Sequence, residues 1–151
     1  SLNFRVAVGH GETANFMNYF LFNNRPVFNA FVALSPSLSY SMEENLTRRL
    51  DLEKDFKIFY YLSTSSLDIK KNKTEIIELN TKISALENQN LLYTFDNFDN
   101  ANHYALAAQS IPKALQSIFL VFQPISKSEY KDYILTLETS PVGRPPARGS
   151  S

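Results

Sequence analysis

The stretch from Phe4 to Phe16 has the residue types of a turn that presents a catalytic nucleophile. Residues 4–8 are typical of a short buried strand, and they are followed by a glycine turn and the start of a helix. A strand, a sharp turn and a helix with the motif Gly-x-Ser-x-Gly form a nucleophile elbow, which exposes a serine hydroxyl. Here Gly9 matches the first glycine, Gly11 takes the place of the serine, and Thr13 takes that of the second glycine. The frame of a catalytic turn is therefore predicted, and its reactive atom is missing.

Two further polar segments carry acidic and imidazole side chains. Residues 63–68 run Ser-Thr-Ser-Ser-Leu-Asp after an apolar stretch, and residues 96–103 run Asp-Asn-Phe-Asp-Asn-Ala-Asn-His after another. In open parallel sheets, sites form at the carboxyl ends of the strands. We therefore expect these two segments and the turn at Gly9–Gly11 to meet at one edge of a sheet.

Apolar periodicity predicts strands that alternate with helices along the chain. This alternation indicates an α/β protein, a three-layer α/β/α sandwich with a mainly parallel sheet of about four strands. A folded domain is expected over residues 1–138, and the Pro-, Gly- and Arg-rich residues 139–151 are expected to be a disordered tail or an appended vector sequence. Lys70, Lys71 and Lys73 are expected to lie in water before the third helix. The expected strands are residues 3–8, 28–34, 56–62 and 91–95, and the expected helices are residues 12–23, 41–50, 74–86, 104–122 (in two pieces, interrupted at Pro112) and 126–137.

Composition excludes several classes of function. Fifteen basic and fifteen acidic residues balance among 151, so no broad field favours nucleic acid or an anionic membrane. No apolar run reaches the roughly 18 residues of a spanning helix, and no signal peptide is visible at the first residues. The chain has no cysteine and only two histidines far apart, so we expect no metal site and no cofactor. The compartment stays open.

From Phe4 to about Leu137 the sequence resembles the second half of one esterase branch of the α/β-hydrolases. That branch contains enterochelin-esterase-like and S-formylglutathione-hydrolase-like enzymes. The order and the spacing of several short segments agree with it together, although none is decisive alone. These segments are Val8–His10, Phe28–Ala30, Leu34–Ser37, Ile58–Ser63, Asn102–His103 and Ile111–Leu115.

The resemblance implies carboxylic-ester hydrolysis through a serine acyl-enzyme, with roles for three positions. The nucleophile position falls at Gly11, the base at His103, and the acid at Asp68, with Asp96 and Asp99 as alternatives for the acid. Because Gly11 has no hydroxyl, we expect the chain to be inactive as it stands, whether the glycine is natural or engineered. The sequence does not reveal the substrate's acyl or alcohol part.

Neighbouring residues of the same types have simpler interpretations. His10 is expected to be structural and to pack behind the elbow. Ser35 and Ser37 are expected to be turn residues around Pro36 and not substitute nucleophiles. Asp68 has a second interpretation, as a plain cap for the helix that follows it.

The family resembled has about four further strands before the elbow, which are absent from these 151 residues. The strand at Asn3–Val8 would then be an open edge. We expect it to pair with its copy in a homodimer or with a complementing N-terminal fragment. Two other functions stay open: a non-catalytic binding or scaffold module that uses the loops above the sheet for a ligand or partner, and a flavodoxin-like domain that binds phosphate at Gly9–Gly11. The latter signal is weak because Glu12 would repel an anion. A small ester is one ligand considered for the chain.

Overall fold

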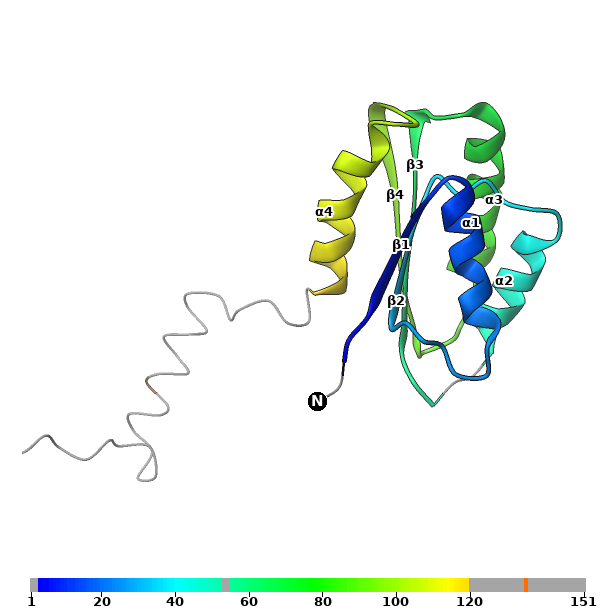
Figure 1. The fold of residues 1–151 in the computed structure, drawn as a ribbon, viewed down its shortest axis with the longest axis vertical. Coiled ribbons are helices and arrows are strands. Elements are labelled where there is room, and N and C mark those ends of the chain that lie inside the picture. Colours follow the sequence, from blue (N-terminus) through cyan, green and yellow to red (C-terminus); the bar gives the residue numbers. More distant parts are fainter. Residues whose placement is uncertain (1–2, 53–54, 120–134, 136–151) are drawn as a thin grey trace, which may run out of the picture. The chain divides into compact units, whose positions relative to one another are not determined.

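The computed structural model describes residues 3–52, 55–119 and 135. Four strands alternate with helices, as the sequence predicts, and all but two of the described residues belong to a compact unit that ends at Ile118 (Figure 1). No helix in this part of the chain is long and apolar enough to cross a membrane. The elements in chain order are β1 (Val6–His10), α1 (Glu12–Asn18), the 3₁₀ helix η1 (Tyr19–Phe22), β2 (Ala30–Leu34), α2 (Met42–Asp51), β3 (Ile58–Leu67), α3 (Lys70–Ser84), β4 (Leu91–Asn102) and α4 (Leu106–Ile118).

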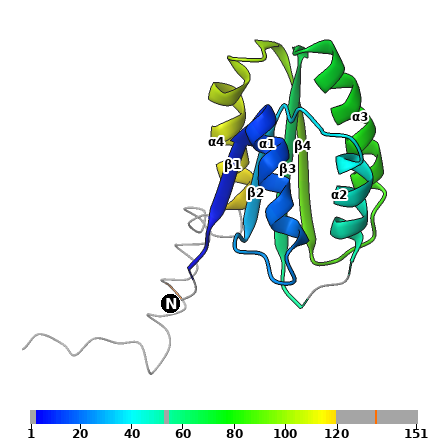
Figure 2. The same cartoon turned by 45° about the vertical axis from the view of Figure 1, so that its right-hand side comes forward.

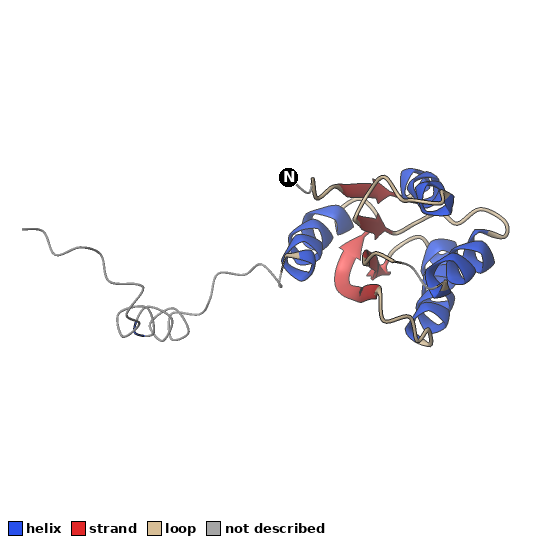
Figure 3. Ribbon diagram, turned by 90° about the horizontal axis from the view of Figure 1, so that it is seen from below, coloured by secondary structure: helices blue, strands red, loops and turns tan. Residues whose placement is uncertain are grey.

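The four strands form one parallel sheet in the order β1-β2-β3-β4. Each crossover joins adjacent parallel strands, and crossovers of one hand place their helices on one face of the sheet. The views from different sides show α1, α2 and α3 on one face and α4 on the other (Figures 2 and 3). The predicted fold class, a three-layer α/β/α sandwich, is confirmed.

The alternation of side chains along β2 explains why both faces of the sheet are buried. Phe31 and Ala33 pack into a core with α1, α2 and α3, whereas Val32 and Leu34 pack into a second core with α4. All five residues of β2 are buried. Because both faces are covered, the strand reads as a continuous apolar run and not as an alternating one.

Two strands extend further than predicted, into segments that were expected to be loops. β3 continues to Leu67 and β4 to Asn102, and they pair beyond the apolar stretch, for example Thr64 with Asn97. The polar side chains find partners there: Ser63 Oγ lies 2.9 Å from Ser110 Oγ. Polar composition was therefore a poor guide to where these strands end, because mutual pairing satisfies their backbone groups.

Several helix boundaries also differ from the predictions. α3 begins at Lys70, so the lysine cluster belongs to its first turns instead of preceding it. α4 is one helix with Pro112 inside it, not two pieces. The first predicted helix is divided into α1 and η1, and β1 starts at Val6 and ends at His10 instead of spanning residues 3–8. The predicted helix at residues 126–137 and the tail at 139–151 lie outside the described residues, apart from Leu135.

Candidate functional site

Gly11 forms the turn between β1 and α1 in a conformation that other residues rarely adopt. Its φ is 61° and its ψ is −122°, and its N–H donates to Leu34 O at 2.9 Å. Its carbonyl accepts from Ser37 N–H at 3.0 Å, so the end of β2 fixes the turn from both sides. Glycine adopts a positive φ without the steric penalty that a Cβ brings. A residue with a side chain would be strained in this turn, and positions of that kind concentrate at functional sites.

Gly9 sits where the strand and the helix after the turn come closest. A Cβ added to Gly9 would lie 2.6 Å from Ala14 Cα and 2.7 Å from Ala14 N, which are backbone atoms that cannot swing away. At the position of the motif's second glycine, Thr13 Oγ1 bonds to both the N–H and the C=O of His10, at 2.9 and 2.8 Å. These contacts hold the elbow in shape.

Asp68 and His103 form a hydrogen-bonded pair beyond the ends of two neighbouring strands. Asp68 follows β3 and His103 follows β4, and Asp68 Oδ1 lies 2.9 Å from His103 Nδ1. The Asp68 side chain has no exposed area, and that of His103 is 16% exposed. A carboxylate in this position holds the imidazole so that its Nε2 faces away from the pair.

The carboxylate of Asp68 is kept ionised by its donors. Burial opposes its ionisation, but hydrogen bonds from Ser35 Oγ, Thr64 Oγ1, His103 and the Ile69 N–H outweigh burial and hold the pKa of Asp68 below its usual value. The donor–acceptor distances from Ser35, Thr64 and Ile69 are 2.9, 2.8 and 2.8 Å. A carboxylate that accepts this many bonds prefers its charged form.

The free side of the His103 ring faces Gly11. A Cβ built on Gly11 would lie 3.4 Å from His103 Nε2 and 3.7 Å from His103 Cε1. An oxygen on that Cβ would come within hydrogen-bonding reach of Nε2, as a nucleophile must of its base. The structure thus brings Gly11, His103 and Asp68 together, in the order that a nucleophile, its base and the orienting acid would take.

Neither of the other two acids considered for this site forms a hydrogen bond to His103 among the described residues. Asp96 Oδ2 accepts a 2.6 Å hydrogen bond from the Tyr61 hydroxyl. Asp99 is exposed near the carboxyl end of β4. The strand extension accounts for the position of Asp96, because residues 96–98 are paired with β3 instead of forming a loop over the site.

Ser35 is more than the turn residue that the sequence indicated. It has a φ of 41° and is fully buried, and its Oγ lies 2.9 Å from Asp68 Oδ1 and 3.0 Å from His103 Nδ1. Asn72 Nδ2 reaches the Ser35 carbonyl, at 3.3 Å, and Ser37 Oγ, at 3.0 Å. Ser35 therefore contacts the imidazole at Nδ1, where Asp68 also bonds, and not at the Nε2 that faces Gly11. A serine directly after a buried strand was the only signal that could have pointed to it.

His10 stacks on His103 at the elbow. The two rings are 4.3 Å apart between centroids and inclined by 26°. Burial, followed by the charge of His103, lowers the pKa of His10, although the His103 backbone and Asp68 act in the opposite direction. Its Nε2 is buried without a hydrogen-bond partner among the described residues. His10 thus forms one wall of the site. Within the described residues, no group of three or more His, Cys, Asp or Glu side chains could hold a metal ion.

No family model and no curated protein matches this chain. It is similar, however, to several solved structures. An uncharacterised protein from Capnocytophaga ochracea DSM 7271 is 26% identical with a TM-score of 0.74, over 91% of this chain and 39% of that one. The BES protein from Bacillus cereus is 24% identical with a TM-score of 0.66, over 75% of this chain and 45% of that one.

Two of the similar structures carry the name of a hydrolase. An IroE-like serine hydrolase from Shewanella oneidensis is 19% identical with a TM-score of 0.71, over 88% of this chain and 46% of that one. The siderophore hydrolase EstB from Aspergillus nidulans is 18% identical with a TM-score of 0.64, over 83% of this chain and 51% of that one. This chain thus spans 39 to 51% of the length of the four structures. Its fold is α/β-hydrolase-like, and the partial coverage fits the carboxyl-terminal half of such a fold.

Proposed function

We propose that this chain is the elbow-bearing half of an esterase-type serine hydrolase whose nucleophile position is Gly11, and that it forms no acyl-enzyme as it stands. One observation carries the proposal: the Cβ position of Gly11 lies 3.4 Å from His103 Nε2, while Asp68 holds the other nitrogen of that ring. In a related active protein, the imidazole would take the nucleophile's proton and return it to the leaving group. Loss of the nucleophile lowers the rate by a factor on the order of 10⁶.

The test is to supply the missing hydroxyl. Two assays are applied to the chain and to Gly11→Ser: hydrolysis of p-nitrophenyl acetate and covalent labelling by a fluorophosphonate. The same comparison is made in any longer natural protein that contains the chain. We expect turnover and a covalent adduct only with Gly11→Ser. Gly11→Ala is the matched control, because it adds a Cβ in the same backbone conformation without an oxygen.

Second substitutions on the Gly11→Ser background test the other two roles. His103→Gln should abolish turnover, and Asp68→Asn should lower it by about 10⁴, as expected when the imidazole loses its orienting carboxylate. Asp96→Asn should change turnover only a few-fold, because Asp96 bonds to Tyr61. Turnover by the unsubstituted chain that depends on His103 would contradict the inactivity, and equal effects of the two Asp substitutions would contradict the role of Asp68.

A binding or scaffold function is the second candidate, and the intact hydrogen-bond network around His103 favours it. The carboxylate of Asp68 accepts hydrogen bonds from Ser35 and Thr64, and Asn72 bonds to Ser35. This network is complete although Gly11 offers no nucleophile. A site of this kind can bind a small ester without cleaving it. Saturable binding of an ester by the chain, with no turnover in the chain or in Gly11→Ser, would favour this second function.

We also propose that β1 pairs with another strand, either from a second copy of the chain or from a complementing N-terminal segment. β1 is an edge of the sheet described here, and it pairs with β2 on one side. Val8 on β1 is 49% exposed and Phe16 on α1 is 64% exposed. An edge strand beside exposed apolar groups invites pairing with another chain.

A further inference from the structure

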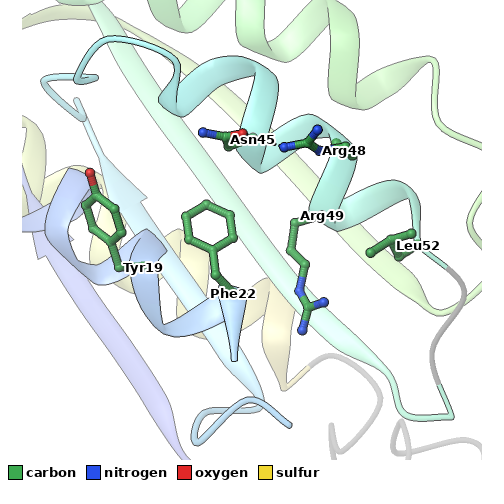
Figure 4. Close-up of a pocket in the computed structure, with 6 residues that line it drawn as sticks. All are labelled: Tyr19, Phe22, Asn45, Arg48, Arg49 and Leu52. Atoms are coloured by element: carbon green, nitrogen blue, oxygen red, sulfur yellow. Dashed lines mark hydrogen bonds between the residues drawn. The ribbon is translucent and has the colours of Figure 1, made fainter. Parts of the chain in front are cut away.

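A cavity of about 450 Å³ lies between η1 and α2, apart from the site at Gly11 (Figure 4). Its volume is in the range of small-molecule sites, about 300 to 1,000 Å³. Tyr19 and Phe22 of η1 lie on one side of the cavity, and the α2 residues lie on the other, as Figure 4 shows. The lining residues are Tyr19, Phe22, Asn45, Arg48, Arg49 and Leu52.

Both charged residues that line this cavity are arginines. Neither Arg48 nor Arg49 lies within ion-pair distance of a carboxylate among the described residues, and no acid belongs to the lining. Asp51, which is near in sequence, lines a different cavity with Glu87. Two guanidinium groups that form no ion pair among the described residues produce a field that favours an anion.

The two guanidinium groups are partly fixed and still have donors to spare. Arg49 donates from Nε to Leu21 O and from Nη2 to Asn23 O, which ties α2 to the end of η1. Arg48 Nη2 donates to Asn45 Oδ1 at 2.7 Å. A guanidinium carries five N–H donors, so each group keeps several for a ligand. The fixed position of Arg49 lowers the entropy lost when a ligand binds.

Three other lining residues are aromatic or aliphatic: Tyr19, Phe22 and Leu52. The rings of Tyr19 and Phe22 pack edge to face, with centroids 5.8 Å apart and an interplanar angle of 81°. Tyr19 is 51% exposed and Leu52 is 47% exposed. An apolar body placed against these side chains would remove that surface from water.

We propose that this cavity binds a small aromatic carboxylate. The carboxylate would accept hydrogen bonds from Arg48 and from the remaining N–H groups of Arg49, and the ring would lie against Tyr19, Phe22 and Leu52. Charge complementarity selects the anion, and the apolar wall selects a flat body over a simple ion such as acetate. The site shares no residue with the pair Asp68 and His103, so it does not depend on the function proposed above.

The probe for this site is 2-naphthoate, titrated against the ¹⁵N-labelled chain, with 2-naphthamide as its uncharged counterpart. We expect saturable shifts confined to the amides of Tyr19, Phe22 and the α2 residues of the cavity, and binding at least about tenfold weaker for the amide, because it lacks the charge-assisted bonds. Equal affinity for the two probes, or shifts that do not saturate, would overturn the proposal.

Substitutions then locate the anion. Arg48→Gln should weaken 2-naphthoate binding by about tenfold or more and leave that of 2-naphthamide nearly unchanged. The matched control is Arg5→Gln, an exposed arginine that does not line the cavity and should bind the probe like the unsubstituted chain. Arg49 is left intact because it holds two carbonyls of the fold. The same loss from Arg5→Gln as from Arg48→Gln would mean that net charge, not this cavity, attracts the anion, and would refute the site.

Discussion

At the scale of single residues, two glycines hold the elbow for different physical reasons. Gly11 is required by its φ of 61°, and Gly9 by the lack of space beside Ala14. Gly11→Ala should lower the free energy of unfolding by about 1 to 3 kcal/mol, the strain of a side chain in that conformation. Gly9→Ala should lower it more, by at least about 3 kcal/mol, because its Cβ would meet backbone atoms.

Denaturant unfolding of both variants checks this ranking. Ala107→Ser on α4, away from the elbow, controls for a small substitution in a packed helix. An equal or smaller loss for Gly9→Ala would mean that α1 shifts to make room for the Cβ, and that the close strand–helix packing is not a requirement.

The stacked histidines give the fold a pH dependence with a definite sign. Burial and the charge of His103 hold the pKa of His10 below 6.5, so the folded state prefers neutral His10. The unfolded state therefore binds the proton more readily, and the free energy of unfolding should fall as the pH is lowered from about 6.5, by at most about 1.4 kcal/mol per pH unit. His10→Phe keeps an aromatic ring and should flatten this part of the profile.

Chemical denaturation between pH 5 and 7.5 measures that dependence. The contribution of Asp68 is separate, because its pKa is held low: its stabilisation is present above about pH 4 and is lost as the pH falls further. A slope that persists in His10→Phe would mean that His103 or another group is its source.

The proximity of Gly11, His103 and Asp68 was more predictable from the sequence than the hydrogen-bond network around them. A motif and a resemblance single out Gly11 and His103, and the structure brings both close to Asp68, while their catalytic roles stay a prediction. The contact of Ser35 with the pair was missed, because a hydrogen bond across 68 residues leaves no periodic signal in the chain. The stacking of His10 on His103 was missed for the same reason.

At the scale of elements, apolar periodicity located every described strand and helix but misjudged many of their ends. The apolar cores of β2 and β3 are continuous runs, which read clearly as buried strands. The ends of β3 and β4 are polar, and only their mutual pairing makes them strands. A pattern in one segment cannot report a partner in another, so strand length was the least predictable feature.

Pro112 is the clearest conflict between local preference and the observed element. It lies inside α4 and is exposed, where its ring displaces one backbone hydrogen bond of the helix. The packing of Ala114 and Ile118 against the sheet holds the helix together across it. Pro112→Ala should therefore raise the free energy of unfolding, by about 1 to 3 kcal/mol.

Thermal unfolding of Pro112→Ala, beside that of Lys113→Ala, measures this effect. Lys113 is the next residue, is also exposed, and should change stability by no more than about 0.5 kcal/mol. Destabilisation by Pro112→Ala would indicate that the helix needs the proline's bend to reach the sheet.

At the scale of the whole molecule, the open side of β1 sets the expected behaviour in solution. Because β1 is an edge of the sheet that the described residues form, its backbone N–H and C=O groups have no strand partner from these residues on one side. Val8→Lys places a charge on this strand, which natural edge strands use to prevent pairing. Light scattering over a range of concentrations should give a mass that rises above that of the monomer for the chain and less so for Val8→Lys.

Val27→Lys is the matched control, because Val27 is 47% exposed on the loop before β2. A monomer at every concentration, which also fails to bind an added segment bearing the preceding strands, would refute the pairing of β1.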